Sequence, residues 1–223
     1  MFNLVRLELK KESFKWYFIG AIIANVLILA LVIPIQYVEK IETDEMFMIT
    51  GALVRAVFMI FGAVLLSKLI IEEYKNKTIF LMYTYPIQRK KLIAAKLLLA
   101  GSLTFITIAI SSAIVATVYF IIHNMFQLSP NVIPVQRLSI EILSMFKFAI
   151  AAAGASLIPL YFGLRRQSVP ATLLSSLLVV TIISQSNPWF SLADNIYISL
   201  AFAVIGVFIA FWTIRNVDKV DAI

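Results

Sequence analysis

Long apolar runs with few charges are the feature that most constrains this chain. A helix needs roughly 20 mostly apolar residues to cross the hydrocarbon core of a bilayer. Because 61% of the 223 residues are hydrophobic and only 14% are charged, a single soluble core cannot hold them. The sequence therefore predicts an all-α polytopic membrane protein, one domain over 1–223, with six transmembrane helices at 16–37, 46–70, 97–122, 139–164, 168–186 and 195–214.

The same composition excludes several other classes of protein. A soluble enzyme, a disordered tail and a secreted disulfide scaffold do not fit it, and the absence of Cys removes disulfides and thiolate metal sites. A membrane barrel would show strands of alternating polarity, which these runs lack. The first run is too long for a signal peptide and follows Glu8 and Glu12, so we expect it to be retained.

The positions of the basic residues predict the orientation. All but four of the 19 Lys and Arg residues lie in the N-terminal segment, the segment after the second run, or directly after the fourth and sixth runs. The exceptions are Lys40, Arg55, Arg137 and Lys147. Since cytoplasmic loops are enriched in Lys and Arg, we expect both termini in the cytoplasm. Topology and anionic lipid then account for the net charge of +7, with no need for a nucleic-acid partner.

The largest predicted cytoplasmic loop covers residues 71–96. Glu73 and Lys77 are four residues apart in the order that favours a helix, and Tyr85-Pro86 interrupts it. A second helical stretch then begins with basic residues, which oppose the helix dipole. Phospholipid headgroups or an acidic partner would favour these charges, whereas the alternative is a solvated hairpin that follows the positive-inside rule.

The loop contains a set of acidic, basic and turn-forming residues at characteristic spacing: Glu72, Glu73, Lys77, Thr78, Tyr85, Pro86, Arg89 and Lys90, with Lys96 further on. This pattern resembles the loop of ABC-2 type transporter permeases. The six-helix plan and the basic lead-in at 1–15 also match, so the resemblance covers the whole chain. The most similar branch contains small bacterial permeases of peptide-antibiotic immunity and peptide export, with a type V exporter-like fold.

This resemblance implies a transport subunit of the bacterial cytoplasmic membrane. In such permeases the loop forms a coupling helix that docks on ABC ATPase subunits, and these subunits bind ATP and Mg. The chain has no G-x-x-x-x-G-K-[ST] motif of its own, so we expect no enzyme activity and no cofactor in it. Six helices supply half of a pathway, which implies a second permease copy or a paralogue. The implied substrate is an amphipathic or antimicrobial peptide.

Two cations fall within predicted spans. Arg55 and Lys147 lie about equally deep from the outer side, and intramembrane charges are often functional. They are candidates for contact with substrate in the pathway. The alternative is that both snorkel toward the outer interface, with Glu141 as a partner.

Other patterns are explained by helix structure and packing. The small residues from Ala149 to Ser156 predict close approach of another helix, and Thr104, Thr107 and Ser111 can bond their own backbone. The lead-in at 1–15 is either a surface-bound amphipathic helix or an ordinary helical start anchored by Trp16 and Tyr17.

Three other functions compete with peptide export. The first is ABC-2 export of a lipid, haem, sodium or a drug. An ion-coupled secondary transporter would need midplane carboxylates, and no predicted span has an Asp or Glu near its middle. An intramembrane serine hydrolase would use Ser156, but His123, the one histidine, falls in the predicted outer loop.

Overall fold

A computed structural model describes residues 2–11, 15–39, 43–76, 89–126, 134–183, 186–187, 190–191 and 196–216. These residues are almost entirely helical, as predicted. The helices are α1 (Phe2–Lys11), α2 (Lys15–Glu39), α3 (Thr43–Leu66), the π-helix η1 (Ser67–Ile71), α4 (Glu72–Lys75), α6 (Arg89–Phe126), α7 (Val135–Ala155), α8 (Pro159–Arg166), α9 (Val169–Ile183) and α10 (Ile196–Arg215). Two short antiparallel strands, β1 (Ser186–Asn187) and β2 (Phe190–Ser191), lie between α9 and α10.

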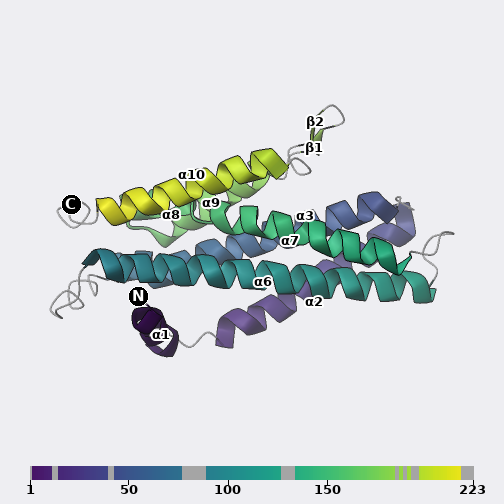
Figure 1. Ribbon diagram of the computed structural model, residues 1–223, viewed down its shortest axis with the longest axis horizontal. Coiled ribbons are helices and arrows are strands. Elements are labelled where there is room, and N and C mark those ends of the chain that lie inside the picture. Colours follow the sequence, from purple (N-terminus) through teal and green to yellow (C-terminus); the bar gives the residue numbers. More distant parts are fainter. Residues whose placement is uncertain are drawn as a thin grey trace.

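The long helices run side by side along the length of the molecule (Figure 1). Five described segments are long and apolar enough to cross a membrane: Lys15–Val38, Glu45–Lys75, Lys90–Phe126, Val135–Arg166 and Ile196–Arg215. They correspond to five of the six predicted spans. The remaining predicted span contains α9, which has 15 residues and extends only about 22 Å at 1.5 Å per residue.

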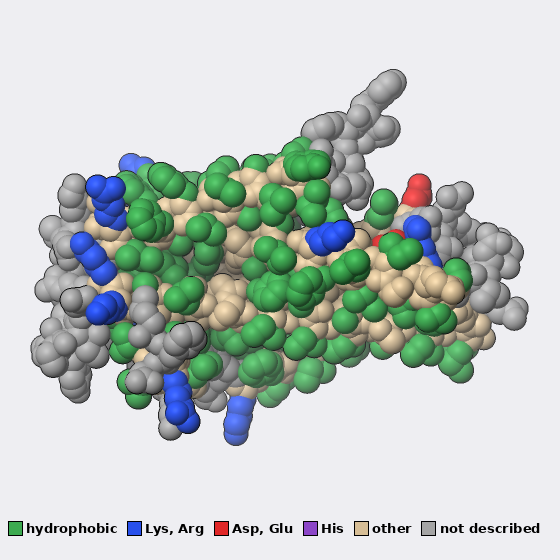
Figure 2. Space-filling model, in the orientation of Figure 1, with side chains coloured by type: hydrophobic (Ala, Val, Ile, Leu, Met, Phe, Trp, Pro, Cys, Tyr) green, Lys and Arg blue, Asp and Glu red, His purple; other side chains and the backbone are tan. Residues whose placement is uncertain are grey.

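The surface of the molecule is apolar along the helices and basic at one end. Lys and Arg side chains gather at the end where both chain termini lie, and hydrophobic side chains cover much of the face between the ends (Figures 1 and 2). Helix α2 illustrates the apolar surface, since Ile22 is 64% and Val26 60% exposed. Contiguous exposed apolar surface on this scale is unfavourable in water, and it suits helices that face lipid.

Two hydrophobic clusters hold the helices together. The larger one joins α2, α3, α6, α7 and α9 through side chains such as Phe58, Ile108 and Ala149. The second surrounds the basic end and includes Tyr17, Ile70 and Ile93, all fully buried. Helix α7 packs on both α6 and α10, and α3 packs on α6 and α9. The second cluster is the setting of the candidate site.

Helix α10 crosses α7 at the small-residue face that the sequence predicts. A Cβ added at Gly154 would lie 2.7 Å from the Cβ of Ala203, and a Cβ added at Gly206 would overlap the Gly154 carbonyl oxygen. The two backbones can approach this closely only because both positions lack a side chain. The predicted packing role of Ala149–Ser156 is thus confirmed.

The predicted fourth span is divided in the structure. Helix α7 ends at Ala155, a turn follows over 156–158, and Pro159 begins α8. Proline lacks a backbone N–H and suits the first turn of a helix, so it separates the two helices at this point. His123 also differs from expectation: it lies in the last turn of α6 rather than in a loop, and it is 1% exposed.

Helix α2 is attached to α6 by polar as well as apolar contacts. The Tyr17 and Thr107 hydroxyls lie 2.9 Å apart, and Asn25 Nδ2 donates to Ser111 Oγ at 3.0 Å. Thr107 also donates to the Leu103 carbonyl oxygen at 2.8 Å, which is the backbone bonding expected from the sequence. These contacts fix the position of α2 along α6.

We expect Gly154→Ala to lower the melting temperature of the detergent-solubilised protein. The added methyl group would meet the Ala203 backbone at 2.9 Å, and overpacking of this kind costs about 1–3 kcal/mol. Gly101→Ala is the control, because nothing lies within 4 Å of its added Cβ and Ala is favoured over Gly in a helix. Equal melting temperatures for the two variants would contradict the close α7–α10 crossing.

Candidate functional site

The candidate site is the junction where η1 and α4 meet the beginning of α6, at the basic end of the molecule. Helix α3 continues directly into the widened turn of η1 and then into α4. In this π-helical turn the Glu72 N–H donates to the Ser67 carbonyl oxygen, five residues back. Turns of this kind are rare and frequently mark functional sites. Here the turn brings the Leu69 carbonyl oxygen within reach of α6.

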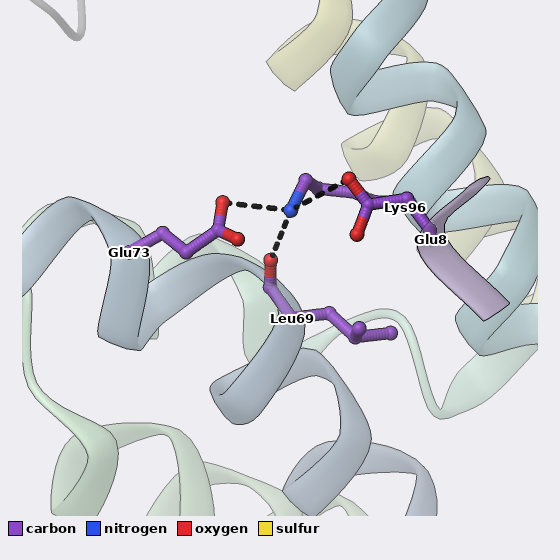
Figure 3. A network of polar contacts seen from close by, with 4 residues as sticks. All are labelled: Glu8, Leu69, Glu73 and Lys96. Atoms are coloured by element: carbon purple, nitrogen blue, oxygen red, sulfur yellow. Dashed lines mark hydrogen bonds and ion pairs between the residues drawn. The ribbon is translucent and has the colours of Figure 1, made fainter. Parts of the chain in front are cut away.

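A single buried ammonium group joins the elements of this junction. The Lys96 side chain is fully buried, and its Nζ lies 2.7 Å from Glu73 Oε2, 3.4 Å from Glu8 Oε1 and 3.0 Å from the Leu69 carbonyl oxygen. Figure 3 shows the three oxygens converging on Nζ from α1, η1 and α4. Lysine has three N–H donors, so these three acceptors match its capacity. We call this set of contacts the Lys96 network.

The surroundings of the Lys96 network make its charges interdependent. Glu8 and Glu73 side chains are 7% and 12% exposed, and the apolar cluster around Ile70 and Ile93 lies beside them. Removing charges from water is costly, and breaking a buried pair leaves the remaining charge uncompensated. The network therefore favours an arrangement in which all three segments stay together.

The structure places four of the predicted loop residues, Glu72, Glu73, Arg89 and Lys90, at or next to this junction. Glu72 and Lys90 are exposed, whereas Glu73 is turned inward to Lys96. Arg89 is the first residue of α6. Lys77, Thr78, Tyr85 and Pro86 lie outside the described residues. Of the two neighbouring carboxylates, Glu72 thus faces outward and Glu73 faces inward.

The predicted pathway residues are separated by the structure. The Arg55 guanidinium stacks over the Phe148 ring at 4.4 Å and lines a cavity of about 20 Å³ between α3, α7, α9 and α10. A cavity of this size holds about one water molecule. Lys147 is exposed on α7 and is not among the described residues that line the cavity. Glu141 pairs with Arg137 at 3.3 Å.

Glu8 and the burial of Lys96 are the features that sequence reasoning missed. The sequence predicts Lys96 as one of the basic residues of the loop and as part of the family resemblance, and it indicates no partner for Glu8. One signal was present: Lys96 is flanked by apolar residues in the run Leu92 to Ala100. A lone lysine in such a run is expected to find an acidic partner or a carbonyl group.

Comparison with known proteins agrees with this architecture. Residues 6–181 match the model of a family described as ABC-2 family transporter protein. The chain belongs to the ABC-2 family of transporter proteins. It is also 48% identical over 227 residues to the uncharacterized protein YcbO of Bacillus subtilis (strain 168), an alignment that covers 99% of this chain and 100% of the relative. No solved structure matches the chain.

Family membership indicates the role of the apolar helices in a transporter. ABC-2 proteins are membrane components of transporters, are not catalytic by themselves, and normally work with an ABC ATPase. The apolar spans therefore belong to a multi-pass membrane protein, and the expectation of a transport protein is confirmed at the level of the family. The beginning of α6, which holds Lys96, lies at the end of the bundle where the basic side chains gather (Figures 1 and 2).

Proposed function

We propose that this chain is the permease subunit of an ATP-driven exporter that receives motion from separate ABC ATPase subunits at the α4–α6 junction. The observation that carries this proposal is the Lys96 network, which ties the beginning and the end of the loop over 77–88 to each other. A displacement applied to that loop must act on α3 and α6 together. Two permease copies, or this chain with a paralogue, would form one pathway.

The proposed topology has six crossings with both termini in the cytoplasm of a bacterial cell. Helix α9, which has 15 residues, makes the sixth crossing, and the chain continues through β1 and β2 to α10. The basic end of the molecule then faces the cytoplasm, in accord with the positive-inside rule and with anionic lipid on that side.

Cysteine labelling tests this topology in the naturally Cys-free chain. A cysteine at Asn76 or Arg166, both exposed at the basic end, is expected to resist an impermeant thiol reagent in intact cells. A cysteine at Tyr197, which is 80% exposed at the opposite end of α10, should react. Reaction of the Asn76 cysteine from outside would contradict the orientation.

Glu72 provides a test of ATPase docking that leaves the Lys96 network intact. Its side chain is exposed beside Glu73, so Glu72→Lys changes the sign of the docking surface without uncovering Lys96. We expect about a tenfold loss of co-purifying ATPase subunit, the effect of removing a strong charge-assisted contact. Glu45→Lys, an exposed change near the start of α3, is the control. Full ATPase association in Glu72→Lys would refute docking at this surface.

The proposed substrate is an amphipathic or antimicrobial peptide, exported or removed from the membrane. The loop resemblance supports this class, and so does the cavity beside Arg55, where alanine, methionine and phenylalanine side chains surround one guanidinium group. An apolar surface with a single cation suits a peptide that carries both apolar side chains and carbonyl or carboxylate groups. The cavity holds only about one water molecule here, so passage of a peptide requires α3 and α7 to separate.

Arg55 and Lys147 are expected to differ in transport. Arg55→Gln should lower ATP-dependent uptake of a fluorescent amphipathic peptide into inside-out vesicles about tenfold, because a charged hydrogen bond is lost. Lys147→Gln should retain uptake, since Lys147 lies outside the cavity lining. If Arg55→Gln is present at a normal level and uptake is unchanged, Arg55 does not contact the substrate and instead snorkels toward the outer interface. If the substrate is instead a lipid, haem, sodium or a drug, the vesicles will take up that compound in an ATP-dependent manner and will not take up the peptide.

A further inference from the structure

Helix α1 is connected to the loop junction by an ionic contact between Glu8 and Lys96. Glu8 is 6% exposed although α1 lies near the end of the molecule, and its carboxylate reaches Lys96 on α6. Its neighbours Leu7 and Leu9 are 61% and 43% exposed. Val5 is half-buried and packs against the cluster that contains Tyr17 and Leu97. Glu8 and Val5 therefore mark the side of α1 that faces α6.

The three contacts of Lys96 are unequal in strength. Glu73 approaches at 2.7 Å and the Leu69 carbonyl oxygen at 3.0 Å, both from the continuous segment of η1 and α4. Glu8 approaches at 3.4 Å, and its second oxygen, Oε2, is buried without a hydrogen-bond partner among the described residues. Charge-assisted hydrogen bonds are strongest at about 2.7–2.9 Å. The contact with Glu8 on α1 is thus the weaker of the two ionic contacts of Lys96.

The unpartnered oxygen of Glu8 also weakens the hold of α1 on Lys96. Lys96 contacts two carboxylates, and a buried oxygen without a hydrogen-bond partner, as Glu8 Oε2 is among the described residues, is unfavourable. The arrangement remains stable only while α1, η1 and α6 keep their present spacing. A small shift of α4 relative to α6 would move Nζ with one carboxylate and away from the other.

We propose that α1 is a latch on the coupling junction, and that Lys96 and Glu8 are positioning residues for the transfer of motion from the ATPase. This inference rests on the proposed function, since the ATPase supplies the displacement. When the loop is displaced, Lys96 keeps Glu73 and releases Glu8, and α1 separates from α6. Because α1 directly precedes α2 in the chain, its release frees the cytoplasmic end of α2, where Tyr17 contacts Thr107.

The latch is tested first in the chain alone, by the reactivity of a cysteine at Val5 toward a maleimide in isolated membranes. Glu8→Gln keeps the shape of the side chain and removes its charge, so we expect about tenfold faster reaction, because the ion pair with Lys96 is lost. Lys96→Met should have the same effect, and Lys96→Arg should restore slow reaction. Arg6→Gln, which removes an exposed charge on the same helix, is the matched control and should not alter the rate.

A second cysteine separates release of α1 from unfolding. A cysteine at Leu7, already 61% exposed, should react at the same rate with and without Glu8→Gln. Unchanged Val5 reactivity in Glu8→Gln would overturn the latch. Faster reaction that also extends to a cysteine at Ile93, buried within α6, would show general loosening and would overturn it as well.

The role in coupling is tested in the complex with its co-purified ATPase subunit. Trapping with ATP and vanadate should raise the Val5 reaction rate above that measured with ADP, and Glu8→Gln should give the higher rate in both states. If the complex hydrolyses ATP while trapping leaves the Val5 rate unchanged, α1 is a fixed anchor and the proposal is wrong. Failure of the proposed function would give a different result: the Glu72→Lys variant would associate with the ATPase subunit as strongly as the unsubstituted chain does.

Discussion

The buried ammonium group of Lys96 is the interaction on which the cytoplasmic end of this protein depends. A lysine side chain with no exposed surface must find its acceptors within the protein. It finds them in two parts of the chain that are distant from it in sequence, α1 and the continuous segment of η1 and α4. The position of α6 relative to the end of α3 is therefore set by electrostatics as much as by apolar packing. The loop that begins after Asn76 and ends before Arg89 is held at both ends by this contact.

The rest of the bundle follows a different rule, because lipid imposes no hydrophobic driving force between apolar helices. Helices in such surroundings associate through close packing of small residues and through interhelical hydrogen bonds. Both devices are present here: Gly154 and Gly206 permit the α7–α10 crossing, and the pair of Asn25 with Ser111 connects α2 to α6. Helix α2 has the least buried of the described apolar spans, so these few polar contacts matter more for it than for the central helices.

Features that depend on composition and residue spacing could be predicted from the sequence. The apolar runs predicted five described membrane spans, and the small residues of 149–156 predicted the α7–α10 crossing. The ABC-2 family, first suggested by the loop from Glu72 to Lys90, is confirmed by the match over residues 6–181. Peptide export and the six-crossing topology stay predictions.

The features that sequence reasoning could not supply depend on contacts between distant segments. Nothing in the spacing of Glu8 relates it to Lys96, 88 residues later, because their proximity arises only when α1 packs on α6. The π-helical turn at 67–71 has no sequence signature, since its residues are ordinary for a membrane helix. The division of the fourth span before Pro159 was visible in principle, because proline lacks the N–H that a continuous helix needs, but the surrounding apolar run obscured it.

Site-specific photo-crosslinking tests the central claim, which is that an ATPase acts on this chain at the α4–α6 junction. A photoreactive phenylalanine analogue at Asn76, exposed at the end of α4, is expected to capture one polypeptide that mass spectrometry identifies as an ATP-binding subunit. The same analogue at Met125, 74% exposed near the other end of α6, is expected to capture none. Absence of the adduct at Asn76 in membranes with active transport, or an equal adduct at Met125, would contradict the account.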